Sequence, residues 1–116
     1  MGLTVYEDVK NEMLEYLFAT VVQLKDSSGE VVGTHESGGE TYVFSVIDWL
    51  TPDGGQVSQD SDIVFDLDAG DNVRSLDFRN DIPGSGDDLF TYQFETVYNY
   101  ATAGTFTISG MKVKID

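Results

Sequence analysis

The spacing of apolar residues changes abruptly near Phe18, and this change constrains the fold more than any other feature of the chain. Before it, apolar residues recur three or four positions apart, which is the spacing of an amphipathic helix. After it, apolar and polar residues alternate, as they do in strands with one buried face. The sequence therefore predicts an N-terminal helical segment, residues 1–19, followed by one β-domain, residues 20–116.

The helix is expected over Thr4–Phe18. Thr4 and Glu7 match the capping box S/T-x-x-E, and Glu7 also places negative charge where the helix dipole favours it. The apolar face of this helix consists of Tyr6, Val9, Met13, Tyr16 and Leu17. We expect this face either to pack on the β-domain or to form an interface with a neighbouring subunit.

Several alternating segments in the first half of the β-domain predict strands. Thr20–Thr34 has a turn sequence at its centre and predicts a hairpin. Thr41–Leu50 is rich in aromatic and β-branched residues, which makes it the strongest strand signal in the chain. Asp62–Leu67 places its apolar residues on one face and predicts a half-buried strand.

The last third of the chain continues the alternation. In Asn72–Arg79, strict alternation puts Val73 on the face opposite to Leu76 and Phe78. Leu89–Tyr100 predicts a long strand that can carry a bulge, and two shorter strands end the chain. About eight strands at intervals of about 8–12 residues favour a mainly β fold, an antiparallel β-sandwich or jelly roll with one N-terminal α-helix.

Net charge is the strongest compositional signal. The 116 residues include 21 acidic and 6 basic ones, which gives a net charge of -15. Binding to nucleic acid through phosphates needs clustered Lys and Arg, so no nucleic-acid partner is expected. No apolar run approaches the roughly 20 residues that span a membrane, so no membrane partner is expected either. The absence of cysteine excludes disulfides and thiolate zinc sites.

The acidic residues are mostly aspartate, and lysine is scarce. This bias is typical of proteins from salt-loving organisms. At about 1 M salt the Debye length falls to about 3 Å, so surface carboxylates repel one another only weakly. The composition therefore predicts a hypersaline source, and an acidic protein from an ordinary environment is the alternative.

Few residues are suited to catalysis or to metal binding. His35 is the only histidine and lies in a segment expected to be a solvated loop, so no catalytic triad and no enzyme activity are expected. Asp66, Asp68 and Asp71 lie around the turn at Gly70 and could bind calcium, which prefers oxygen ligands. Their spacing differs from that of an EF-hand loop, and solvated surface carboxylates are the alternative. No other cofactor is expected.

Aromatic residues offer two candidate surfaces. Trp49 could bind a glycan, with packing in the core as the alternative. Tyr92, Tyr98 and Tyr100 are candidates for an interface, because tyrosine is enriched where one side of a residue is apolar and the other is wet.

The order of segments resembles a family of small virion proteins of tailed phages, of the head-decoration or tail-fibre-associated type. The similarity covers most of the chain and is carried by these segments: Tyr16-Leu17-Phe18, Trp49, Gly54-Gly55, Ile63-Val64-Phe65, Val73–Phe78, Asn80-Asp81, Gly84–Gly86, Leu89–Tyr92 and Ala103–Ile108. Together with the acidic composition, the resemblance suggests a tailed virus of a halophilic, archaeal host.

The resemblance implies a location in the virion and a structural role. A capsid decoration, turret or cement subunit is expected, with the major capsid protein or tail proteins as partners and a homo-oligomer in the particle. A tail or baseplate component is one alternative. A small carbohydrate-binding β-sandwich module is another.

The charge predicts that stability depends on salt. The melting temperature should rise between dilute buffer and about 1 M NaCl, because screening removes repulsion among the carboxylates. A thermal melting series followed by circular dichroism would measure this. Equal melting temperatures in dilute buffer and in molar salt would contradict the halophilic interpretation.

Overall fold

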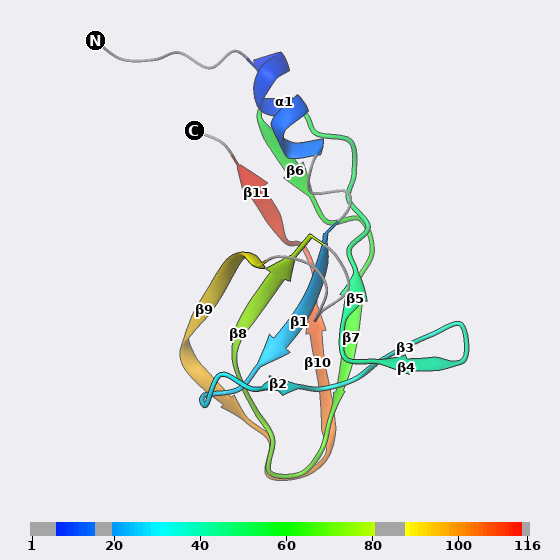
Figure 1. Cartoon of the computed structure of the whole chain (residues 1–116), viewed down its shortest axis with the longest axis vertical. Helices are drawn as coiled ribbons and strands as arrows, with labels where there is room; N and C mark the ends of the chain where they lie inside the picture. Colours follow the sequence, from blue (N-terminus) through cyan, green and yellow to red (C-terminus); the bar gives the residue numbers. More distant parts are fainter. Residues whose placement is uncertain (1–6, 16–19, 81–87, 115–116) are drawn as a thin grey trace.

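The computed structural model describes residues 7–15, 20–80 and 88–114. Within this part of the chain the fold is mainly β, with one helix and several antiparallel sheets (Figure 1). The elements are α1 (Glu7–Glu15), β1 (Val21–Lys25), β2 (Val31–Val32), β3 (His35–Ser37), β4 (Glu40–Tyr42), β5 (Ser45–Val46), β6 (Gln56–Ser58), β7 (Ile63–Leu67), β8 (Asn72–Arg79), β9 (Asp88–Asn99), β10 (Gly104–Ile108) and β11 (Lys112–Lys114). The predicted helix ends beyond Glu7–Glu15 lie outside the described residues.

The largest sheet is built around β1 and β8. All five residues of β1 pair antiparallel with β8, from Val21 opposite Arg79 to Lys25 opposite Ser75. The other edge of β1 is divided between β2 and β5, and β9 pairs with the far edge of β8. β1 and β2 pair antiparallel, which confirms the predicted hairpin. In the turn between them, the Asp26 carboxylate accepts hydrogen bonds from the backbone N–H groups of Ser28 and Glu30.

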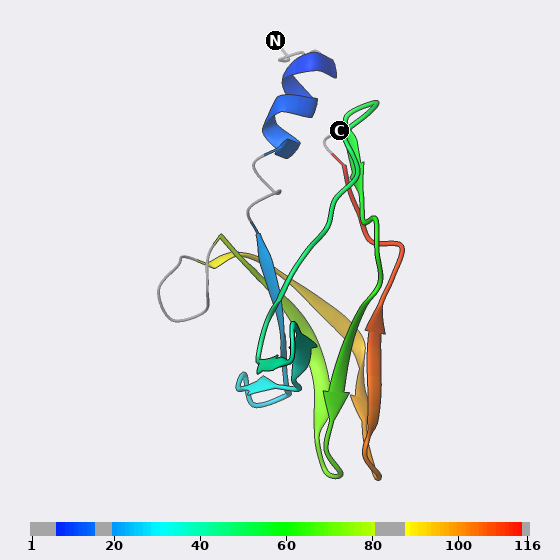
Figure 2. The same ribbon diagram turned by 90° about the vertical axis from the view of Figure 1, so that its right-hand side faces the viewer.

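The β7–β10 pair forms a second layer. The two strands pair without any shift in register, from Gly104 opposite Leu67 to Ile108 opposite Ile63. Figure 2 shows that this pair and the β8–β9 strands approach each other at the turns after β7 and β9 and diverge toward α1. The β6–β11 pair continues upward beside the helix.

The core lies between these two layers. The strands β7 and β10 contribute Ile63, Phe65, Leu67 and Ile108, and β1 and β8 contribute Val22, Leu24, Val73, Leu76 and Phe78. The alternation predicted for β7 is confirmed, since its first, third and fifth residues are buried and the two between them are exposed. Apolar side chains from segments far apart in sequence therefore hold the two layers together.

The predicted strand over Thr41–Leu50 is wrong as a continuous element. The segment contributes the end of β4, the two-residue β5, and a single bridge between Trp49 and Gln59. The reason is that this segment shares one edge of β1 with β2. β2 occupies one part of the free edge of β1, so only Ser45 and Val46 can pair with the remainder.

A bulge overturns the predicted faces of β8. The register between β8 and β9 shifts between Val73 and Ser75, so Val73 joins Leu76 and Phe78 in the core. Asp77, on the opposite face, is also buried, where its carboxylate lies 3.4 Å from Lys25 Nζ and accepts a hydrogen bond from Thr91. A buried charge of this kind needs such partners.

The helix α1 contacts the β-domain at β6. Leu14 is buried, and the Asn11 side-chain oxygen accepts a hydrogen bond from the Gly55 N–H at 3.0 Å. Val9 and Met13 belong to the predicted apolar face and are 46% and 49% exposed. The other members of that face, Tyr6, Tyr16 and Leu17, lie outside the described residues.

Gly33 is expected to tolerate substitution poorly. It has φ +83°, and an added Cβ would lie 3.3 Å from Leu24 Cδ1 and 3.4 Å from Leu67 Cδ2. Gly33→Ala should lower the free energy of unfolding by about 2–4 kcal/mol, because backbone strain and crowding of the core add. Urea denaturation would measure the loss.

Gly29 is the matched control for this substitution. It has φ +80°, but nothing lies within 4 Å of the position that an added Cβ would take. Gly29→Ala should therefore cost about 1–2 kcal/mol, from backbone strain alone. Equal losses for the two variants would show that Gly33 does not lie against the core.

Candidate functional site

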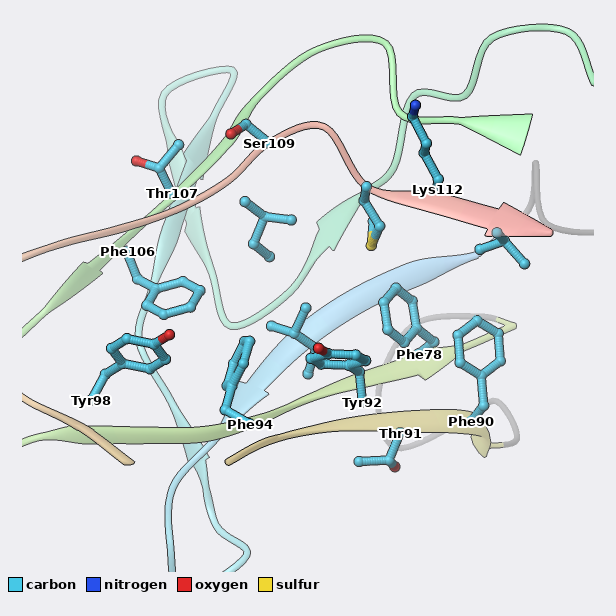
Figure 3. A pocket seen from close by; sticks show the side chains of 14 residues that line it. Phe78, Phe90, Thr91, Tyr92, Phe94, Tyr98, Phe106, Thr107, Ser109 and Lys112 are labelled. Carbon is cyan, nitrogen blue, oxygen red and sulfur yellow. The ribbon is translucent and has the colours of Figure 1, made fainter. Parts of the chain in front are cut away.

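An apolar cleft opens between β9 on one side and β10 and β11 on the other. It has a volume of about 650 Å³. Figure 3 shows Phe78, Phe90, Tyr92, Phe94, Tyr98 and Phe106 gathered between the two walls. The cleft exists because the two layers diverge here, so the inner face of β9 is not covered by a facing strand in the described structure.

Alternation along β9 directs its aromatic side chains into the cleft. Phe90, Tyr92 and Phe94 are two residues apart and therefore share a face. Phe90 stacks on Phe78 of β8 with ring centroids 4.5 Å apart, and Tyr92 meets Phe94 edge-on at 5.4 Å. Phe90 is 39% exposed and Tyr92 is 59% exposed, so this wall of the cleft is open to solvent.

A group of three rings closes one end of the cleft. The centroids of Phe94 and Tyr98 lie 5.2 Å apart, and each lies 5.7 Å from the Phe106 centroid. Four residues of regular strand would separate Phe94 from Tyr98 by about 13 Å. The bulge in β9 therefore brings these two rings together.

Arg74 supports that bulge from β8. Its Nη1 donates a hydrogen bond to the Glu95 carbonyl at 3.2 Å. With the Gln93 amide oxygen turned toward Arg74, that oxygen accepts from Nη2 at 2.8 Å and from Nε at 3.0 Å. Arg74 thus satisfies the Glu95 carbonyl, which the bulge removes from the β8–β9 ladder, and also binds the Gln93 side chain.

The described lining of the cleft contains no acidic residue, although the chain carries 21 of them. None of the 14 side chains that line it is Asp or Glu. Lys112 is the one charged residue among the 14, and Figure 3 shows its side chain extending away from the aromatic rings. Exposed tyrosine and phenylalanine without nearby carboxylates are typical of the centre of an interface.

The predicted interface tyrosines have different positions. Tyr92 and Tyr98 both line the cleft, and Tyr98 is 47% exposed. Tyr100 instead donates a hydrogen bond from its hydroxyl to the Thr105 carbonyl at 2.8 Å. Sequence reasoning missed Phe90, Phe94 and Phe106, although the alternation of aromatic residues over 90–94 was a usable signal.

The candidate calcium ligands are not gathered into one site. The backbone of Asp66 pairs with Thr34, and the Asp71 carboxylate accepts a hydrogen bond from the Asp68 N–H at 2.8 Å. Among residues 7–15, 20–80 and 88–114, no group of three or more His, Cys, Asp or Glu side chains could hold a metal ion. Calcium binding at this turn stays a prediction without geometric support.

Trp49 and His35 both contact the body of the protein. Trp49 is partly buried against the core, and its Nε1 lies 3.4 Å from Thr20 Oγ1 as a donor. His35 lies in β3, where its Nδ1 is 3.0 Å from the Val64 carbonyl oxygen and its ring is 5.8 Å from that of Phe65. The expectation of a loop at His35 is therefore wrong, since the residue belongs to a strand, where it is partly exposed.

Comparisons with models of protein families, with curated proteins and with solved structures give no match. In the described part of the chain, no helix has the length and apolar character that crossing a bilayer requires. The cleft is therefore interpreted from its own geometry.

Tyr100 should make stability sensitive to alkaline pH. Burial raises the pKa of its hydroxyl above the ordinary 10.0, so the folded state favours the neutral form. At neutral pH Tyr100→Phe should cost about 0.5–1.5 kcal/mol, the value of the hydrogen bond to Thr105. Because the pKa is raised, this contribution is present below pH 10 and is lost as the pH rises through the folded-state value.

Urea denaturation of both proteins over a pH series would measure this difference. The gap between wild type and Tyr100→Phe should close above about pH 10. Every other ionisable group is the same in both proteins, so its effect cancels in the comparison. A gap that stays constant through this range would contradict the role assigned to the Tyr100 hydroxyl.

Proposed function

We propose that the chain is a structural, non-enzymatic subunit of a tailed-virus particle and that it attaches to its neighbours through the apolar cleft. The two layers are then an open β-sandwich whose uncovered side is the attachment surface. A capsid decoration or cement subunit is the role that fits best, because such a subunit works by burying surface between neighbours.

The observation that carries this proposal is an aromatic cleft whose described lining contains no acidic residue, on a chain of net charge -15. Repulsion between acidic surfaces opposes contact over most of a chain with this charge. Contact at the cleft avoids that cost and buries aromatic side chains, which supply much of the binding energy at interfaces. An assembly role explains both the exposed rings and the absence of carboxylates from the part of the lining that the structure describes.

The assignment to a virus is supported by the order of sequence segments. The segments that resemble small virion proteins include Ile63-Val64-Phe65 and Leu89–Tyr92, which form part of β7 and of β9. The second of these contributes the open wall of the cleft. The resemblance and the candidate site therefore involve the same part of the chain.

The exposed face of α1 is a second attachment surface that fits the same role. Val9 and Met13 are about half exposed, whereas Leu14 of the same helix is buried. A carbohydrate-binding role through Trp49 has less support, because that side chain is partly buried against the core. Glycan binding that disappears in Trp49→Ala without loss of stability would favour the carbohydrate role instead.

Fractionation of virus particles would test the proposal. A lysate of the source culture is separated on a density gradient, and each fraction is analysed for the chain by mass spectrometry. The chain should sediment with the major capsid protein, and electron cryomicroscopy of that fraction should place it on the particle. Recovery of the chain only among free proteins would contradict the proposal.

Labelled variants would identify the attachment surface. Purified Tyr92→Lys should co-sediment with particles at least about tenfold more weakly than wild type, because it places a charge among the aromatic side chains. Val64→Lys is the matched control, since Val64 is exposed on the β7 face opposite to the core. Equal losses for both variants would mean that the cleft is not the attachment surface.

A further inference from the structure

The edge of β10 beside the cleft is open and regular. Over Gly104–Ile108 this strand has no charged residue, no proline and no shift in register. Natural proteins usually protect an edge strand with one of these devices. β9, on the opposite side of the cleft, has two such shifts in its pairing with β8, so β10 offers the better edge for pairing.

The hydrogen bonds on the far side of β7 reveal which β10 groups face outward. The Asp66 N–H and C=O both pair with Thr34, and the Val64 carbonyl faces His35. Because backbone groups alternate along an antiparallel strand, Ile63, Phe65 and Leu67 are the β7 residues that bond to β10. Their partners in the register are Ile108, Phe106 and Gly104.

Thr105 and Thr107 therefore direct their backbone groups away from β7, toward the open edge. The Thr105 carbonyl accepts a hydrogen bond from the Tyr100 hydroxyl. Because Tyr100 is not part of β7, this bond agrees with a carbonyl that points away from β7. In the described part of the chain, nothing pairs with the N–H or C=O of Thr107. Thr107 also lines the cleft, and Figure 3 shows it on the side where Phe106 lies.

We propose that an extended segment of a partner polypeptide pairs with β10 at Thr107 and lays alternate apolar side chains into the cleft. The new strand would face the inner surface of β9 and cover Phe90 and Tyr92. Strand addition of this kind gains affinity from main-chain hydrogen bonds and specificity from pockets for every second side chain. The proposal names the chemistry of the partner for the assembly role proposed above and rests on it.

The charges of the cleft lining and of the whole chain indicate which kind of partner segment fits. Among the described residues that line the cleft there is no carboxylate, and the lysine among them extends outward, so the part of the segment that enters the cleft should be neutral and apolar. A second copy of the chain fits less well, because pairing would bring together two molecules of net charge -15. A small amphiphile would fill the cleft without using the Thr107 backbone.

Selection from a displayed library of random peptides of about seven residues, a common strand length, would test the proposal on the purified chain. Enriched peptides should alternate apolar and small polar residues without acidic residues at the apolar positions. Peptides chosen from the enriched pool are then labelled, and their affinity is measured by fluorescence polarisation. No enrichment, or enrichment of charged peptides, would overturn the proposal.

Substitutions at the edge separate strand pairing from simple apolar binding. Thr107→Pro removes the outward N–H without removing a bond to β7 and should weaken peptide binding at least about tenfold. Thr107→Val keeps the N–H and should bind as wild type does. Circular dichroism would check folding. If Thr107→Pro is unfolded, a peptide with N-methylated backbone amides decides on the wild-type chain: it keeps the apolar side chains but loses main-chain donors, so it should bind at least about tenfold more weakly than the unmodified peptide, and equal binding would overturn strand pairing.

Two other occupants of the cleft would give different results in these experiments. A doubled mass in light scattering that Thr107→Pro abolishes would show that a second copy takes the edge. Laurate binding that displaces the peptide and is equal in Thr107→Pro would show a site for amphiphiles. Either outcome overturns the proposed partner. Because these experiments use the chain alone, their failure is distinct from absence of the chain from virus particles.

Discussion

Burial of apolar side chains between the two layers is the interaction on which the rest of the structure depends. Phe65 and Leu67 of β7 pack in one cluster with Val22 and Leu24 of β1, and no disulfide can assist because the chain has no cysteine. With a net charge of -15, repulsion among surface carboxylates opposes the compact state. The core must therefore supply the stability that holds the layers together.

The cleft follows from the limited width of that core. The β7–β10 pair covers β1 and β8, and β9 extends the larger sheet beyond it. The rings of Phe94, Tyr98 and Phe106 fill the narrow end, while Phe90 and Tyr92 remain exposed at the wide end. The same divergence leaves the outward backbone groups of Thr107 open. The divergence of the two layers thus accounts for both parts of the candidate site, the exposed aromatic rings and the open backbone groups of Thr107.

Local sequence signals predicted the elements whose form depends on their own residues. The β1–β2 hairpin follows from its turn sequence, and the burial of alternate residues in β7 follows from their spacing. The division of Thr41–Leu50 did not follow, because it depends on which part of the β1 edge β2 leaves free. The burial of Val73 also depended on a bulge that only pairing with β9 creates. Tyr92 and Tyr98 were predicted as interface residues. That they line the same cleft could not be predicted, because the cleft is formed by the packing of several strands.

The central claim is that the isolated chain keeps the outer edge of β10 open for a partner. Amide hydrogen exchange, measured residue by residue by NMR, tests this most directly. The N–H groups of Phe106 and Ile108 should exchange slowly because they bond to β7, and that of Thr107 should exchange fast. Protection of Thr107 equal to that of its two neighbours, in the chain alone and at a concentration where it is monomeric, would contradict the account.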